Sequence, residues 1–376
     1  MKIEEVSFTD KVVLLRVDYN VPVLDGKILD SIRIVRSLQT IRFLSNRGAK
    51  VVLLTHFGKP KARYEQSLSL KRIVFSELQT LLPDMKLFFS DLSGLNDILS
   101  VTKSGDVILL ENIRFYEGEI ENRDTFSSML ASYADFYVND AFSVSHRKHA
   151  SVIGIPKFLP SVMGLSLKDE ISWIQKFQSP DIPFLVIMGG AKVSSKLQMI
   201  SVLSEQAQHI FVGGGIANSI MRQKGINIGK SLYENIPLIN CDKIVLPVDV
   251  LVLKGDIYKS EPVVVDIRYI PQGWTVCDIG FASVIHLKRL IDNVGIVLWS
   301  GTLGISENEH CNATDEIASY IAHRTNSGMV KSIIGGGDTL SATIKYRDSF
   351  SYVSVAGSAF LTYIAQDTLP GIEQLL

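Results

Sequence analysis

The sequence predicts an α/β fold of two lobes, each a mainly parallel sheet flanked by helices, joined by an interdomain helix. Short β-branched apolar runs recur along the chain, and each is followed by turn residues and a longer helical pattern. This series of runs occurs twice, on either side of one helical segment. The chain has 376 residues, whereas a domain typically has roughly 100–200. Two lobes are therefore expected.

The first series predicts a lobe spanning residues 1–162. Its strands are expected at KVVLLRV (11–17), AKVVLLTH (49–56), DVILLEN (106–112) and ADFYVND (134–140). This βαβ rhythm implies a Rossmann-like, mainly parallel sheet that is covered on both faces.

A connecting helix is predicted over residues 163–179. Its apolar residues recur at helical spacing, at Leu167, Ile171, Ile174 and Phe177, before Pro180 and Pro183 end the pattern. One more surface helix of the first lobe is the alternative, but the position between two complete series favours a link between lobes.

The second series predicts a lobe spanning residues 180–365. Its strands are expected at IPFLVIMGG (182–190), HIFVGGG (209–215), VGIVLWSG (294–301) and VKSIIGGG (330–337). The rhythm of strand and helix is the same as in the first lobe.

Composition excludes several classes of protein. With 46% hydrophobic and 20% charged residues, the chain is expected to be globular throughout. The net charge is −1, from 38 basic and 39 acidic residues, so no global field attracts nucleic acid or an anionic membrane. A site for an anionic ligand must therefore be formed by basic residues that gather at one place in the fold.

A cytoplasmic protein is expected. Cys241, Cys277 and Cys311 lie far apart, without metal-ligand or disulfide-framework spacing, which indicates free thiols in a reducing compartment. The segment MKIEEVSFTD lacks the apolar core of a signal peptide, and no run approaches the ~18 apolar residues of a membrane span.

Basic residues follow the strands of the first lobe. Ligands of parallel sheets gather beyond the carboxyl ends of the strands, and these ends supply Arg33, His56, Lys59, Arg114, His146, Arg147, Lys148 and His149. Arginine binds planar carboxylate and phosphate groups through two points, so a ligand bearing both groups is indicated, with Asp18 and Asn20 holding its hydroxyls. Any one of these cations taken alone is better explained as a solvated surface residue. A core histidine satisfied by a backbone carbonyl is the alternative for His56 and the favoured explanation for His149.

Glycines follow the strands of the second lobe. The strand ends are MGGAKVSSK (188–196), VGGGIAN (212–218), WSGTLG (299–304) and GGGD (335–338). Glycine backbone can approach a phosphate closely, and the N–H groups at the start of the following helix are free donors. These ends predict a site for the phosphates of a nucleotide.

Charged residues beside the glycines fit the same ligand. Lys192 and Lys196 are four apart, on one face of a predicted helix, and would neutralise phosphate charge. Asp338 would either cap a helix or meet a magnesium ion that bridges phosphate oxygens, and the two roles are compatible.

Two common nucleotide motifs are absent. The dinucleotide pattern G-x-G-x-x-G fails because GGGIAN ends on Asn218 and GGGDTL on Leu340, and the P-loop pattern fails at Lys224. A lobe for a small anion facing a lobe for a magnesium nucleotide is instead the layout of phosphoryl transfer. Such catalysis consists mostly of positioning and charge neutralisation, with lobe closure expelling water.

At these motifs the sequence resembles the phosphoglycerate kinase family along nearly its whole length. The matching stretches, in the order of the family, are RVDYNVP (16–22), HFGKP (56–60), LLENIRF (109–115), VNDAFSVSHRKHAS (138–151), GGAKVSSK (189–196), GKSLYE (229–234), CDIG (277–280) and GGGDT (335–339). The resemblance implies transfer of the acyl phosphate of 1,3-bisphosphoglycerate to ADP, giving 3-phosphoglycerate and ATP, with Mg²⁺. It also implies a hinge-bending monomer.

Residue roles carried over from the family are implied by the resemblance alone. Phosphoglycerate would be bound by Asp18, Tyr19, Asn20, Arg33, His56, Phe57, Gly58, Lys59, Arg114 and Arg147. The nucleotide would be bound by Lys196, Gly213, Gly214, Gly280, Glu307, Gly336, Gly337, Asp338 and Thr339, with Asp338 at the metal. Arg33, Lys192 and Gly337 would be catalytic. The family also implies that residues 366–376 return to the first lobe.

Four departures from the family pattern bear on rate and on nucleotide geometry. Lys59 stands where arginine is usual, which predicts somewhat weaker substrate binding because a point charge replaces a two-point contact. Ser300 and Thr302 replace Asn and Pro, Phe281 replaces Pro, and VAGSAF (355–360) replaces a glycine-rich stretch. A catalytically weakened metabolite-binding protein of the same fold is therefore kept as the alternative, and a nicotinamide dehydrogenase as a more distant one.

Overall fold

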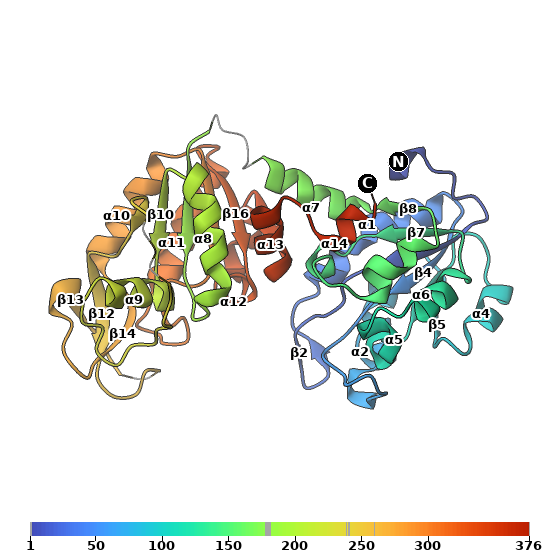
Figure 1. Cartoon of the computed structure of the whole chain (residues 1–376), viewed down its shortest axis with the longest axis horizontal. Coiled ribbons are helices and arrows are strands. Elements are labelled where there is room, and N and C mark those ends of the chain that lie inside the picture. The colour runs from blue at the N-terminus through green and yellow to red at the C-terminus, as the bar shows by residue number, and fades with distance from the viewer. Residues whose placement is uncertain (1, 177–181, 238, 240, 259, 376) are drawn as a thin grey trace. The chain divides into compact units, whose positions relative to one another are not determined.

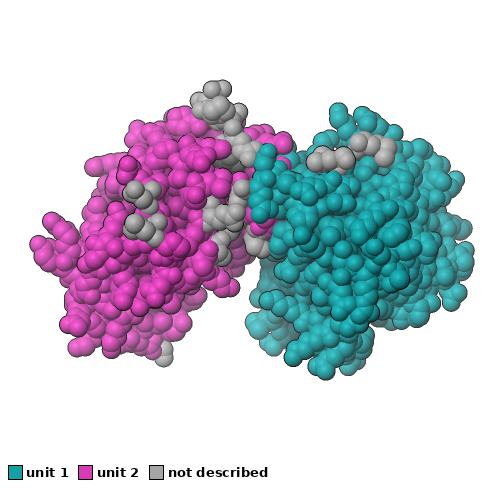
Figure 2. All heavy atoms as spheres, viewed as in Figure 1, with its two compact units in different colours: residues 1–172, 366–376 teal, residues 173–365 magenta. Residues whose placement is uncertain are grey.

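The computed structural model describes every residue except 1, 177–181, 238, 240, 259 and 376. The chain divides into two compact units (Figure 2). Unit 1 comprises residues 1–172 and 366–376, and unit 2 comprises residues 173–365. The predicted two-lobed α/β fold is confirmed. Across the described part of the chain, none of the helices combines the length and the apolarity that a membrane span needs.

Unit 1 contains a six-stranded sheet in the order β5-β6-β4-β1-β7-β8, with every pair parallel. The four predicted strands are β1 (Val12–Arg16), β4 (Lys50–Leu54), β6 (Val107–Leu110) and β7 (Phe136–Asn139). The sequence reading missed β5 (Leu87–Ser90) and β8 (Ser161–Met163). Flanking helices include α1 (Ile32–Asn46), α2 (Leu70–Ile73), α3 (Phe75–Leu81), α4 (Leu95–Val101), α5 (Glu117–Ile120) and α6 (Asp124–Ala131) (Figure 1).

The core of unit 1 explains why the central strands are apolar throughout. Val13 and Leu15 of β1 pack with Ile34 and Ile41 of α1 in one buried cluster. Leu14, which points to the opposite face, is also fully buried. The start of α1 is fixed by Asp30, whose Oδ1 accepts the N–H of Ile32 at 2.9 Å. This places the first turn of α1 beside the end of β1.

Unit 2 repeats the plan with the order β11-β10-β9-β15-β16-β17, again parallel throughout. The four predicted strands are β9 (Phe184–Met188), β10 (His209–Val212), β15 (Ile296–Ser300) and β16 (Lys331–Gly335). Short edge strands were missed, namely β11 (Ile244–Val245) and β17 (Tyr352–Ser354). Its helices include α8 (Ser194–Gln206), α9 (Gly214–Gln223), α10 (Phe281–Asp292), α11 (Ala313–Asn326), α12 (Gly337–Ala342) and α13 (Ser358–Gln366).

Unit 2 also carries an antiparallel sheet that the sequence reading missed. It has the order β13-β12-β14, with β12 at Asp249–Leu253, β13 at Val263–Asp266 and β14 at Thr275–Ile279. In unit 1 a two-stranded hairpin of β2 (Val23–Leu24) and β3 (Lys27–Ile28) was missed as well.

The predicted connecting helix is present as α7 (Leu165–Gln175). Asp140 accepts the N–H groups of Ser166 and Leu167 at its start, at 2.8 and 3.1 Å. Toward its end, Trp173 stacks on Tyr352 with ring centroids 5.3 Å apart. The division between the units falls after Ser172, inside this helix. The rest of the predicted segment, residues 177–179, lies outside the described residues.

The last residues of the chain pack on unit 1. Gly371, in α14 (Pro370–Glu373), donates its N–H to Ser145 O at 2.8 Å. Asn139 Nδ2 donates to Gly371 O at 3.1 Å. A Cβ at Gly371 would lie 2.5 Å from Cγ1 of Val152, so the segment needs glycine there.

We expect Gly371→Ala to lower the free energy of unfolding by about 1–3 kcal/mol, because the added methyl group overpacks the contact with Val152. Urea unfolding of the full chain measures the change. Glu373→Ala, an exposed position of the same helix, is the control and should have little effect. Equal stability of the two variants would contradict the prediction.

Candidate functional site

Four neighbouring strands of unit 1, β6, β4, β1 and β7, bring their following loops to one edge of the sheet. Asp18, Tyr19 and Asn20 follow β1, and His56 through Lys59 follow β4. Arg114 follows β6, in the 3₁₀ turn Ile113–Phe115, and Arg147 lies beyond β7. The predicted residues of the first lobe therefore gather at one edge.

Asp18 organises the first of these loops. Its carboxylate accepts hydrogen bonds from Arg33 Nη1 and Ser143 Oγ, and from the N–H of Asn20 at 3.0 Å. Arg33 comes from the first turn of α1. The pair fixes the direction of a half-buried guanidinium beside the strand ends.

Asn112 is a residue that the sequence reading missed. It exchanges hydrogen bonds with Phe57, accepting from its N–H at 3.2 Å and donating to its carbonyl at 2.8 Å. Arg114 Nη1 donates to Gly58 O at 3.0 Å, and the N–H of Gly58 donates to Asn20 Oδ1 at 2.9 Å. The loops after three strands are thus joined. The available signal was the position of Asn112 directly after an apolar run.

The electrostatics of this edge favour an anion. Burial, followed by the nearby Arg16 and Arg114, lowers the pKa of His56 well below its usual value. Burial together with Arg16 and Arg147 lowers the pKa of Arg114 to about 10. Arg114 Nη2 and Arg147 Nε are buried and have no hydrogen-bond partner among the described residues. Buried donors without an acceptor are costly, and an anionic ligand would satisfy them.

Arg16 and Glu119 form a buried layer that was also missed. Arg16 Nε donates to Ser151 Oγ at 2.9 Å, and Ser151 Oγ donates to Glu119 Oε1 at 2.7 Å. Arg16 Nη2 lies 3.4 Å from His56 Nδ1. Because guanidinium nitrogens only donate, this contact makes Nδ1 the acceptor and leaves the proton on Nε2.

Other predicted residues occupy different surroundings. The side chains of Tyr19 and Phe57 belong to the buried core, and Tyr19 Oη bonds Ser37 Oγ at 2.9 Å, so these two residues can offer a ligand little beyond their backbone. Lys59 is exposed. His149 Nδ1 lies 3.7 Å from Glu119 without forming a hydrogen bond with a described residue, and burial lowers the pKa of His149 to about 4. The histidine is therefore neutral, but it is only partly buried and is not the satisfied core residue that was expected.

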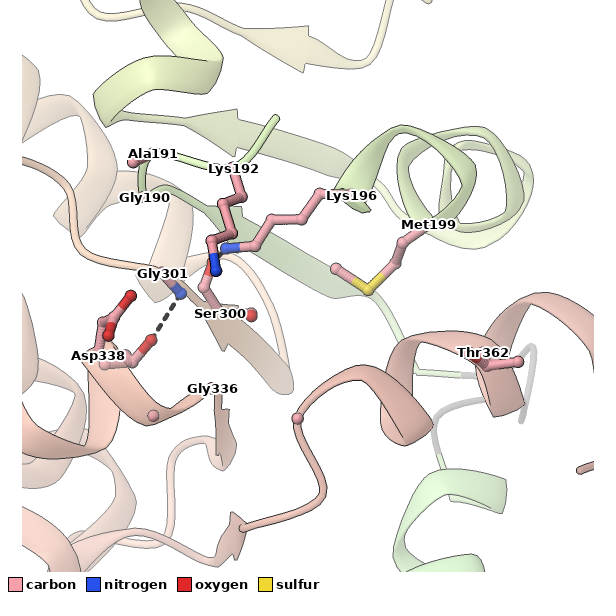
Figure 3. Close-up of a pocket in the computed structure, with 13 residues that line it drawn as sticks. Gly190, Ala191, Lys192, Lys196, Met199, Ser300, Gly301, Gly336, Asp338 and Thr362 are labelled. Atoms are coloured by element: carbon pink, nitrogen blue, oxygen red, sulfur yellow. Dashed lines mark hydrogen bonds between the residues drawn. The ribbon is translucent and has the colours of Figure 1, made fainter. Parts of the chain in front are cut away.

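In unit 2 the glycine-rich strand ends surround a cavity of about 380 Å³. It is lined by Gly190, Ala191, Lys192, Lys196, Met199, Ser300, Gly301, Gly336, Gly337, Asp338, Thr339, Gly357 and Thr362. The Lys192 and Lys196 side chains both extend toward the end of β15, with Asp338 across from them (Figure 3).

Lys196 is held against backbone carbonyls. Its ammonium group donates to Gly189 O at 2.6 Å and to Ser300 O at 3.0 Å. Burial lowers its pKa to about 8, and the Asp338 carboxylate opposes that shift. A partly desolvated cation of this kind interacts strongly with an incoming anion.

Gly301 allows the strand ends of β9 and β15 to lie close together. Its φ is +97°, and a Cβ there would collide with Gly189 O and with Lys196 Nζ. Its N–H donates to Thr339 Oγ1 at 2.6 Å, the bond dashed in Figure 3. Thr339 is fully buried, so its hydroxyl fixes the loop after β16 to the loop after β15.

A second cavity of about 520 Å³ shares Gly190, Ala191 and Asp338 with the first. Its other lining residues include Gly214, Gly215, Leu232, Leu303, Gly304, Ile305 and Glu307. Glycine backbone and aliphatic side chains therefore form much of its wall, together with charged residues such as Asp278 and Glu307.

Three residues of this lobe have surroundings that the sequence did not indicate, and the nucleotide contacts of Gly280 and Gly213 stay predictions. Gly280 faces the Asp249 carboxylate, where a Cβ would clash, rather than either cavity. Gly213 packs on Leu303. A Cβ added at Gly213 would lie 3.0 Å from the Cα and the carbonyl oxygen of Leu303. Lys192 precedes α8 rather than lying on it, although it reaches the same cavity as Lys196.

The N–H groups at the start of α8 are not free donors, contrary to expectation. The Glu234 carboxylate accepts from Val193 N at 2.9 Å and from Ser194 N at 2.8 Å. Phosphate recognition beside β9 must therefore depend on the lysines and on other backbone groups. Glu234 ends the motif GKSLYE (229–234), about forty residues beyond the start of α8, and nothing local in the sequence pairs it with that helix.

The departures at the end of β15 leave the backbone contacts intact. The Ser300 and Thr302 carbonyls accept from Gly189 N at 3.0 Å and Gly190 N at 2.8 Å.

Phe281 is an exposed first residue of α10, a position where the loss of proline is tolerated. Gly357, within the 355–360 stretch, lines the smaller cavity.

The residues at Asp338 fit a magnesium ion that is bound mainly through phosphate oxygens. Among the described residues, no cluster of three or more His, Cys, Asp or Glu side chains forms a metal cage. Mg²⁺ commonly uses one or two carboxylates together with substrate phosphates. A single exposed Asp338, at the rim of both cavities, satisfies that requirement.

Comparison with known proteins gives the family. The family model for phosphoglycerate kinase matches residues 3–367. The chain belongs to the phosphoglycerate kinase family. Relatives named phosphoglycerate kinase from Wolbachia pipientis subsp. Culex pipiens and from Bartonella tribocorum are each 40% identical, over 393 and 394 residues, covering 100% of this chain and 98% of theirs.

Solved structures agree. The phosphoglycerate kinase of Coxiella burnetii matches with a TM-score of 0.84 at 32% identity, and that of Pyrococcus horikoshii with 0.84 at 28%. Each comparison covers 100% of this chain and 98% of the other. The resemblance stated from the sequence motifs is confirmed, and the chain is an enzyme of a phosphotransferase family that is dependent on ATP or ADP and generally on magnesium.

We expect the affinity for ADP to fall as pH rises through about 8, because Lys196 loses its charge there while the ADP phosphates are already ionised. The loss should approach about tenfold per pH unit at most. Calorimetric titration between neutral and alkaline pH measures it. Lys196→Arg, which keeps the charge, should give a flatter profile, and an equally flat wild-type profile would contradict the prediction.

Proposed function

We propose that the chain catalyses reversible transfer of the acyl phosphate of 1,3-bisphosphoglycerate to ADP, giving 3-phosphoglycerate and ATP, in glycolysis. The single observation that supports this best is the family membership over residues 3–367. The chemistry of the two units agrees with it, since unit 1 gathers arginines at its strand ends and unit 2 gathers glycines and lysines.

In unit 1, phosphoglycerate would occupy the edge where Arg114 Nη2 and Arg147 Nε lack partners within the described chain. His56 would donate through Nε2, and Asp18 and Asn20 would contact the hydroxyl. Arg33 would face the transferring phosphoryl group, where its guanidinium neutralises developing charge. Gly58 and Lys59 would complete the loop around the ligand.

In unit 2, the nucleotide phosphates would occupy the smaller cavity and the base the larger one. Lys192 would stabilise the transferring group, and Lys196 the phosphates of the nucleotide. The backbone of Gly336 and Gly337 would approach the phosphates, since a Cβ at Gly337 would meet open space and so would occupy part of the cavity. Mg²⁺, held beside Asp338, would supply charge neutralisation when bound.

Direct transfer requires the acyl phosphate and ADP to come into line without water, because water would consume the phosphoryl group. Hinge bending at the connecting helix is the proposed means. We also propose that the enzyme is a cytoplasmic monomer without nucleic-acid or membrane partners. Its cysteines, Cys241, Cys277 and Cys311, are free thiols in the structure. None of the described contacts favours the catalytically weakened alternative.

The function and the metal are tested together by coupled detection of ATP formed from 1,3-bisphosphoglycerate and ADP, with and without magnesium. ATP should form with magnesium and fall sharply without it. Asp338→Asn should raise the KM for the magnesium nucleotide by at least about tenfold, because it removes a charged metal ligand, and should leave the KM for phosphoglycerate unchanged. Asp348→Asn, at an exposed position, is the control. Equal effects of Asp338→Asn on both substrates would remove Asp338 from the metal site.

Arg33→Ala should lower kcat by roughly 10²–10³-fold, the cost of removing one group that stabilises transition-state charge. Melting should change little, because the Arg33 side chain is half-buried and lies outside the apolar core. Arg42→Ala is the matched control, since Arg42 lies on the same helix in an exposed ion pair with Asp84. A near-normal kcat in Arg33→Ala would refute the assigned role.

A further inference from the structure

Glu234 replaces the missing cap of α8. Val193 occupies the N-cap position and has no side-chain acceptor for the first N–H groups of the helix. Both oxygens of the Glu234 carboxylate take that role, at 2.9 Å from Val193 N and 2.8 Å from Ser194 N. These hydrogen bonds, led by the one from the Ser194 N–H, lower the pKa of Glu234. The carboxylate therefore stays ionised at the positive end of the helix dipole.

The segment around Glu234 also holds the start of α9. The N–H of Glu234 donates to Ser219 Oγ at 3.0 Å, and Ser219 Oγ donates to Gly215 O at 2.7 Å. Two residues earlier, Leu232 O accepts from Asn218 Nδ2 at 3.0 Å. Residues 232–234 thus join the N-terminal turns of α8 and α9. Gly190 and Ala191, before α8, line both cavities, and the first residues of α9, Gly214 and Gly215, line the larger one.

The two lysines of the cavity lie on either side of the capped turn. Lys192 immediately precedes Val193, and Lys196 is two residues beyond Ser194. Both line the cavity of about 380 Å³ (Figure 3). Glu234 therefore fixes the stretch of backbone from which both lysine side chains extend. A shift of this turn would displace both ammonium groups relative to Gly301 and Asp338.

We propose that Glu234 is a positioning residue for phosphoryl transfer, which fixes the turn carrying Lys192 and Lys196 and so holds their ammonium groups at the phosphates. The inference rests on the proposed function, in which these lysines take the nucleotide and the transferring group. Glu234 itself lines neither cavity and acts through the backbone of residues 193 and 194. A displacement of about 1 Å is enough to cost up to about 10²-fold in rate.

The test uses Glu234→Gln in the full chain, with Glu205→Gln as the matched control. Glu205 is an exposed residue in the last turn of the same helix. We expect Glu234→Gln to lower kcat by about tenfold or more and to raise the KM for ADP, while the KM for 1,3-bisphosphoglycerate stays unchanged. Glu234→Asp, which keeps the charge, should restore part of kcat. Glu205→Gln should behave as wild type.

A double-variant cycle separates positioning from a general loss of stability. If Glu234 acts through Lys192, Glu234→Gln should cost much less in a Lys192→Ala background than in wild type. Full additivity would overturn the proposal. So would unchanged kcat and ADP KM in folded Glu234→Gln, or equal rises in KM for both substrates. If Glu234→Gln fails to fold, the same criteria apply to Glu234→Asp. Absence of ATP formation by the wild type would instead refute the proposed function.

Discussion

Parallel pairing of neighbouring strands is the constraint on which both candidate sites depend. In unit 1, β1 pairs in parallel with β4 and β7, and in unit 2, β9 pairs in parallel with β10 and β15. Parallel strands all end at the same edge of a sheet, so residues separated by a hundred positions in the sequence become neighbours. Helices and the remaining loops then hold these ends in place.

The two edges offer an anion different kinds of contact. The edge of unit 1 uses charged side chains such as Arg33 and Arg114, fixed by Asp18 and by backbone carbonyls. The edge of unit 2 uses closely packed backbone, with glycine at 301 allowing two strand ends to approach. Arginine side chains suit a small acid, because they recognise where its carboxylate and phosphate groups lie. Exposed backbone N–H groups suit the successive phosphates of a nucleotide.

The sequence was sufficient to predict the strands that end at these sites, because β1 and β9 are apolar on both faces and leave a strong signal. It was also sufficient for most residues directly after those strands. The antiparallel sheet was missed although β12 (DVLVL) and β13 (VVVD) are apolar runs, because these two strands are not each followed by a helical pattern as the strands of the parallel sheets are. Glu234 and Asp249 were missed because each contacts a helix N-terminus far away in the chain, and such pairings are set by tertiary packing. The contact of Gly280 with the Asp249 carboxylate was not predicted for the same reason.

The C-terminal segment has a consequence for the order in which the protein can be completed during synthesis. Asn139 and Ser145 lie near the end of β7, yet the backbone groups that satisfy them belong to Gly371. A ribosome must therefore translate all of unit 2 before unit 1 acquires its final hydrogen bonds. Until then Ser145 O lacks the N–H of Gly371, and Val152 lacks its contact with this glycine.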